Sequence, residues 1–218
     1  MSLHLATLNN NGVIALQTGR FNDAVLCFRQ AMDFAKQFGQ NVGNRSEGVA
    51  DLPDLPVLRA SLENEKMMSL TEVSPNNCFD VYQHAFLLPR QGMEALRHSL
   101  EITFVLLYNL ALTYHLAGLY HRNDIFLATA SQLYKRVYQA YISRTSVLCL
   151  TVTLACIGNL GHVYSHLQHH LDAQICFVLL QQLIRTNSTV SLDPTDDRFF
   201  SVLAYCSSSL AMSVAATA

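Results

Sequence analysis

Three apolar segments of the chain each contain an asparagine followed two positions later by a small residue, and this recurrence constrains the fold more than any other feature. The three copies are Asn10 with Gly12, Asn109 with Ala111, and Asn159 with Gly161. Each copy lies in an apolar segment and is followed by a second segment with helical periodicity. Such self-similarity indicates stacked units, each of which buries its apolar face on its neighbours. The repeat therefore predicts three pairs of antiparallel helices, with turns near Gly19, Gly118 and Gln168.

Packing explains why small residues recur in these predicted pairs. A residue such as Gly12 lets two helices approach closely, while Phe28 and Phe177 fill the space to the next unit. The segments that carry the full pattern are Leu160-Gly161-x-x-Tyr164 with Ala173-x-x-x-Phe177, and Gly12 with Ala24-x-x-x-Phe28. This pattern resembles the tetratricopeptide repeat family. The resemblance implies an all-α fold, a short right-handed α-solenoid of about three helix pairs plus a capping helix.

The spacing of the copies predicts the boundaries within a single domain, 1–218. Gly12 and Ala111 are 99 residues apart, and Ala111 and Gly161 are 50 apart, whereas a regular array repeats every 34 residues or so, roughly. The longer units resemble kinesin-light-chain-like repeats, and the first gap requires an irregular insertion. We expect repeat one at 3–38, the insertion at 39–97, repeat two at 98–143, repeat three at 145–186, a linker at 187–193 and a capping helix at 194–216.

The predicted insertion contains two kinds of sequence. Residues 39–56 are rich in glycine and proline, which is typical of a loop. Residues 79–88 include Val81, Tyr82 and Phe86, which favour a short strand or a folded-back extended segment that ends at Pro89. One alternative is that the insertion folds into the groove of its own array and blocks it.

The charge balance and the cysteines limit which classes of partner and which cellular compartment we expect. Fourteen basic and sixteen acidic residues give a net charge of -2, without the basic excess that binding to nucleic acid requires. Two uncharged stretches, 102–121 and 145–171, contain polar side chains that are costly in lipid, so we expect buried helices and no membrane span. A start without a signal sequence and six cysteines without CxxC pairing predict a cytoplasmic protein with reduced thiols.

The resemblance also implies that the first helix of each pair lines a concave groove. There, Asn10, Asn109 and Asn159 form a ladder of amides that can donate to and accept from the backbone of an extended peptide. The alternative is that these amides bridge neighbouring helices inside the array. The other residues expected to contact a partner are Val13, Gln17, Tyr108, Leu112, His115, His162 and His166. None of them is lysine or arginine, so a terminal carboxylate held by a basic clamp is not the expected ligand.

These features predict a noncatalytic adaptor or scaffold that binds a partner protein or peptide in the groove without a cofactor. The sequence contains no Gly-rich phosphate loop and no nucleophile elbow. Two alternatives stay open: a structural homo-oligomer that associates through apolar surface, and a metal-binding protein that uses His162 and His166. The acidic residues Asp193, Asp196 and Asp197 are expected to cap the last helix.

Overall fold

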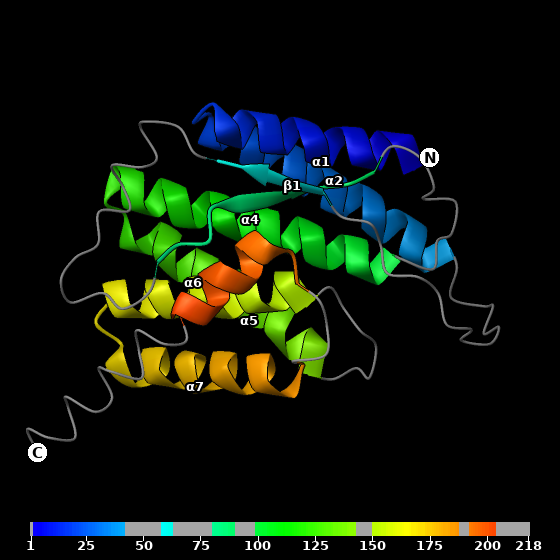
Figure 1. The fold of residues 1–218 in the computed structure, drawn as a ribbon. Helices are drawn as coiled ribbons and strands as arrows, with labels where there is room; N and C mark the ends of the chain where they lie inside the picture. Colours follow the sequence, from blue (N-terminus) through cyan, green and yellow to red (C-terminus); the bar gives the residue numbers. More distant parts are fainter. Residues whose placement is uncertain are drawn as a thin grey trace, which may run out of the picture.

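The described part of the chain is mostly helical, as the sequence predicted, and it carries one small two-stranded sheet (Figure 1). The computed structural model describes residues 2–41, 58–62, 80–89, 99–142, 150–187 and 192–203. The helices are α1 (Ser2–Gln17), α2 (Phe21–Asn41), α4 (Ser99–His121), α5 (Asp124–Ile142), α6 (Leu150–His166) and α7 (His170–Thr186). A further helix covers residues 194–203.

Consecutive helices form three pairs joined by short turns. Helix α1 packs on α2, α4 on α5, and α6 on α7, and α2 and α5 each contact the first helix of the next pair. Two turns lie where the sequence predicted them: Gly19 and Gln168 have positive φ angles of 71° and 61°. The predicted turn near Gly118 is wrong, because α4 continues past this residue and the chain turns at Arg122, with a φ of 51°.

The contacts of Gly118 explain why the second turn was misplaced. A Cβ atom at Gly118 would lie 2.8 Å from Cγ of Leu127, so this glycine serves the close packing of α4 on α5. The turn has a different signal, Asn123, whose Oδ1 accepts a hydrogen bond from the N–H of Ile125 at 3.0 Å. Asn123 therefore caps α5 at its start, a role that asparagine favours.

Gly12 confirms the packing role predicted for the small residues. A Cβ atom at this position would lie 2.7 Å from Cε1 of Phe28, whose side chain is fully buried. Helices α1 and α2 thus pack at a separation that leaves no room for a side chain here.

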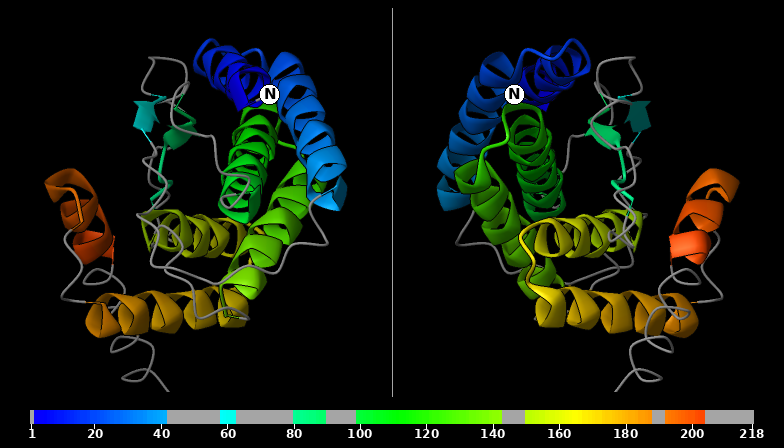
Figure 2. Two further views of the ribbon diagram at one scale, coloured as in Figure 1. Left: turned by 90° about the vertical axis from the view of Figure 1, so that its right-hand side faces the viewer. Right: turned by 90° about the vertical axis from the view of Figure 1, so that its left-hand side faces the viewer.

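The two strands come from the predicted insertion. Strand β1 (Leu58–Ser61) pairs antiparallel with β2 (His84–Leu87). Strand β2 lies in the segment that the sequence predicted to be extended, whereas β1 was not predicted. Figure 2 shows both strands on the inner side of the curved row of helix pairs, with helix 194–203 at the open side of the curve. The insertion therefore reaches the inner face of the array.

The helix boundaries lie near the predicted limits of the units. Helix α2 ends at Asn41 where the prediction was 38, α5 ends at Ile142 near the predicted 143, and α7 ends at Thr186 as predicted. The loop predicted at 39–56 is wrong at its start, because residues 39–41 belong to α2. The rest of that loop, 42–56, lies outside the described residues, as do 143–149 before α6 and 204–216 of the predicted capping helix.

Helix α4 is apolar on all sides because other elements surround it. In the described part of the chain, Glu101–His121 is the one helical stretch long and apolar enough to cross a membrane. In its most apolar window, 83% of the residues are buried inside the protein. A central helix of a packed array has this composition because it has no polar face to present to water.

We expect Gly12→Ala to lower the free energy of unfolding by about 1–2 kcal/mol. The added methyl group must displace the Phe28 ring, which costs about 1–3 kcal/mol, and improved helix propensity offsets up to about 1 kcal/mol. Gly158→Ala is the matched control, because its Cβ would meet Cδ2 of Leu203 at 3.2 Å, and a flexible side-chain end can move. Urea unfolding measures both variants, and equal losses would contradict a tight α1–α2 contact.

Candidate functional site

Residues 81–88, called the resident segment below, lie extended along the inner face and have different partners on their two edges. The backbone N–H and C=O groups of the odd-numbered residues point toward β1. Ala85 lies opposite Ala60, and the N–H of Leu62 donates to the C=O of Gln83 at 3.0 Å. Backbone groups alternate in direction along a strand, so the even-numbered residues turn their N–H and C=O groups to the other edge. The helices, not a third strand, complete that edge.

The three predicted asparagines, called the asparagine ladder below, supply the partners. Each side-chain amide accepts a hydrogen bond from the N–H and donates one to the C=O of a single residue in the resident segment. The pairs, with the two distances, are Asn159 with Tyr82 (2.7 and 3.3 Å), Asn109 with Phe86 (2.9 and 2.8 Å) and Asn10 with Leu88 (3.0 and 3.0 Å). An antiparallel strand exchanges the same two bonds with a residue opposite it. The ladder therefore acts as a strand edge built from side chains.

The spacing along the segment follows from geometry. The ladder engages residues 82, 86 and 88, at steps of four and then two. Packed helices lie roughly 10 Å apart and an extended chain rises about 3.3 Å per residue, so one helix pair matches about three residues. Because only every second residue faces the ladder, steps of four and two replace two steps of three. Tyr108 serves the residue left over, since its hydroxyl donates to the C=O of His84 at 3.1 Å.

A fourth asparagine, Asn9, joins the site and was not predicted as a contact residue. Its amide donates to the C=O of Phe86 at 2.9 Å and accepts from the amide of Asn109 at 2.9 Å. The second bond joins α1 to α4, so the alternative role of bridging helices is also present. The doubled asparagine in the sequence, Asn9-Asn10, was the available signal. Asn9, Asn109 and Asn159 are fully buried, which costs little because their amides are neutral and bonded.

The other predicted contact residues lie in three settings. Val13 and Leu112 are fully buried core residues. Gln17 donates to the C=O of Ser61 at 2.9 Å and so supports β1. His115 is fully buried, and its two ring nitrogens meet Nδ1 of His162 at 3.0 Å and the hydroxyl of Tyr134 at 3.4 Å.

His115 and His162 connect to the ladder through Tyr134. The amide of Asn159 donates to the Tyr134 hydroxyl at 3.2 Å, which continues the chain of polar contacts. Burial lowers the pKa of His115 well below its usual value, and burial together with His166 lowers the pKa of His162 to about 3. Both rings are therefore neutral near pH 7. The ring of His166 is exposed and stacks on His162 at 6.3 Å between centroids.

Among the residues that the structure describes, no three His, Cys, Asp or Glu side chains gather as metal ligands would. His115 lies beside the pair proposed for a metal, His162 and His166, but these three described histidines do not form a group that could hold a metal ion. Nδ1 of His162 also lies within hydrogen-bond distance of Nε2 of His115, at 3.0 Å.

The acidic cluster at the last helix does more than cap it. Asp193 accepts from the N–H of Thr195 at 3.0 Å, which confirms a capping role there. It also pairs with Arg59 of β1 at 2.7 Å, and this hydrogen bond lowers the pKa of Asp193. Asp196 is buried and binds both Arg59 and the hydroxyl of Tyr82. Capping is therefore the wrong explanation for Asp196, which ties the last helix to the insertion.

Comparison with protein-family models, with curated proteins and with solved structures finds no match.

We expect Asn109→Ala to lower the free energy of unfolding by about 2–3 kcal/mol, because the buried N–H of Phe86 loses its acceptor. Asn11→Ala is the matched control: this asparagine is exposed on α1, and its loss should change stability by no more than about 0.5 kcal/mol. Urea unfolding compares the two. Similar small losses for both would mean that the ladder contributes little to holding the segment.

Stability should fall as the pH drops from about 6.5 toward 3. In that window the unfolded chain protonates His162, whose ordinary pKa is 6.5, while the folded protein keeps it neutral down to about 3. The folded state then binds fewer protons, so the free energy of unfolding decreases by up to about 1.4 kcal/mol for each pH unit. His162→Gln should flatten this slope in urea titrations. An unchanged slope would contradict the assignment.

Proposed function

We propose that this protein is a noncatalytic interaction scaffold, in which a tetratricopeptide-like array of three helix pairs binds an extended partner peptide on its inner face. The order of contacts supports the array, because each pair touches the next along the chain. The close fit of Gly12 against Phe28 supports the residue pattern of such repeats. A small strand pair from the insertion lies in the groove of this array.

The observation that carries the proposal is the pairing of the asparagine ladder with backbone atoms. Amide-to-backbone bonds of this kind do not depend on the side chains of the bound chain, so they suit any extended peptide. In the described part of the chain, the helix side chains that bind the segment backbone are amides and a phenol, and none of these is a lysine or arginine that would hold a terminal carboxylate. The proposed ligand is thus an internal stretch of a partner chain.

In this proposal the resident segment fills the groove until a partner segment replaces it. The exchange conserves the hydrogen bonds of the ladder, since both chains offer the same N–H and C=O groups. The tether gives the resident segment an effective concentration on the order of millimolar. A partner therefore needs either higher intrinsic affinity or prior release of the resident segment.

The proposed setting is a reducing compartment such as the cytoplasm. Cys156 and Cys176 are free thiols buried among the helices. Burial raises the pKa of the Cys176 thiol to about 12, so it stays protonated and unreactive. Both cysteines act as small apolar packing residues.

Peptide binding to a weakened variant tests the proposal. The full chain with Phe86→Ala and Leu88→Ala should bind a labelled peptide of residues 80–89 at least about tenfold more tightly than the wild type, because its own segment competes less. Fluorescence anisotropy measures both affinities. Circular dichroism checks the fold, and Leu88→Ala alone serves if the double variant loses helix.

The control for this experiment is the same peptide N-methylated at the Phe86 amide, which removes the N–H that Asn109 accepts. Its affinity should fall about tenfold. If the folded variant binds neither peptide, the groove holds its own segment as a fixed structural element and the proposal fails.

A further inference from the structure

Tyr82 of the resident segment occupies a site formed by helix 194–203. Its ring stacks on Phe200 with centroids 5.2 Å apart and meets Phe199 edge-on at 5.3 Å. Its hydroxyl donates to Oδ1 of Asp196 at 2.7 Å. Asp196 is only 2% exposed and is also bound by Arg59. The site therefore contacts both features of a tyrosine, the aromatic ring and the hydroxyl.

The remaining positions of the segment differ sharply in the space around them. Ala85 is fully buried, so a larger side chain has no room there. Phe86 and Leu88 are each 1% exposed and fill apolar sites. Gln83 and Leu87 are only partly buried. Tyr82, Ala85, Phe86 and Leu88 are thus constrained, whereas the partly buried positions of Gln83 and Leu87 are more tolerant.

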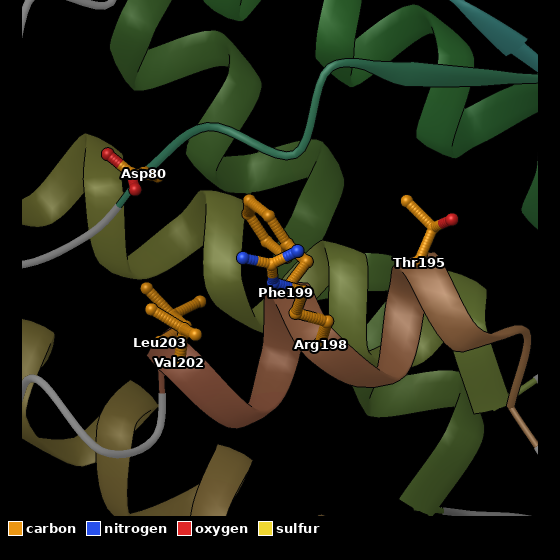
Figure 3. A pocket seen from close by; sticks show the side chains of 6 residues that line it. All are labelled: Asp80, Thr195, Arg198, Phe199, Val202 and Leu203. Atoms are coloured by element: carbon orange, nitrogen blue, oxygen red, sulfur yellow. The ribbon is translucent and has the colours of Figure 1, made fainter.

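A cavity of about 360 Å³ lies where the segment begins (Figure 3). Its lining residues are Asp80 from the segment side and Thr195, Arg198, Phe199, Val202 and Leu203 from helix 194–203. Phe199 thus borders both this cavity and the ring of Tyr82.

We infer that the groove selects a partner segment that contains a tyrosine. Counted from this tyrosine, the segment has a small residue three positions later, an aromatic residue four positions later and an aliphatic residue six positions later. This inference rests on the proposed function and adds side-chain selection to backbone pairing. The positions are those of Tyr82, Ala85, Phe86 and Leu88. The partner is an unphosphorylated protein segment in extended conformation.

The tyrosine is the most specific of the four requirements. Phenylalanine would leave the buried Asp196 carboxylate without one of its donors, and a site built to bind a hydroxyl discriminates against the analogue that lacks it. Phosphotyrosine would place about two negative charges against the same buried carboxylate. Both changes leave the backbone pairing of the ladder intact, so they test side-chain selection alone.

The test uses the full chain carrying Phe86→Ala and Leu88→Ala and labelled peptides of residues 80–89. Relative to the parent peptide, we expect about tenfold weaker binding for Tyr82→Phe, tenfold or more for Ala85→Leu, and roughly a hundredfold for the phosphotyrosine form. A Gln83→Ser peptide is the matched control and should bind within about twofold of the parent. In a protein that also carries Asp196→Ala, the Tyr82→Phe peptide should bind as well as the parent.

The results distinguish the side-chain selection rule from the proposed function. Equal binding of all peptides would overturn the selection rule while leaving backbone pairing, and so the proposed function, intact. Binding of no peptide by the folded variant would overturn both. If the double variant does not fold, the chain with Tyr82→Phe replaces it, because this change removes one hydroxyl and keeps the ring. A Tyr-to-Phe preference that survives Asp196→Ala would also refute the assigned role of the carboxylate.

Discussion

Hydrogen bonds between asparagine side chains and the backbone of one extended segment are the interaction on which the other features of the inner face depend. A helix satisfies its own backbone groups internally, so a helical surface offers no edge for a strand to pair with. Yet a strand that packs against helices must find hydrogen-bond partners for each of its buried N–H and C=O groups. Amide side chains solve this problem because each one carries a donor and an acceptor side by side. Asn10, Asn109 and Asn159 stand at matching places on successive helix pairs, and so together they form the missing edge.

Once the backbone is paired, the side chains of the segment can be buried on the inner face. Phe86 and Leu88 fill apolar sites, and Tyr82 extends to helix 194–203, which meets it with Phe200 and the carboxylate of Asp196. Strand β1 adds Arg59, which links two parts of the chain that are far apart in sequence. The inner face is therefore assembled from the helix pairs, the insertion and the last helix together. Loss of any one of these parts would leave buried polar groups in the others without partners.

The sequence predicted the helix pairs, the asparagines of the ladder and the extended segment because each has a local signal. It assigned the ladder to a partner peptide, whereas in the structure the three amides pair with residues of the same chain. Recurrence placed the asparagines, and β-branched and aromatic residues ahead of a proline placed β2. The parts that it missed depend on contacts over long sequence distances: Arg59 meets Asp196 137 positions later, and no local pattern indicates that pairing. Gly118 was misassigned as a turn because close helix packing and a tight turn both favour glycine. His115 was expected in the groove, but a histidine on an apolar helix fits equally well in a buried polar network.

The most direct test of this account is the detection by NMR of scalar couplings across the ladder hydrogen bonds. The account predicts couplings from the amide nitrogens of Tyr82, Phe86 and Leu88 to the side-chain carbonyl carbons of Asn159, Asn109 and Asn10, in that order, with slow solvent exchange at all three amides. Rapid exchange of these amides in the folded protein, with no such coupling, would contradict the claim that the asparagine ladder holds the segment.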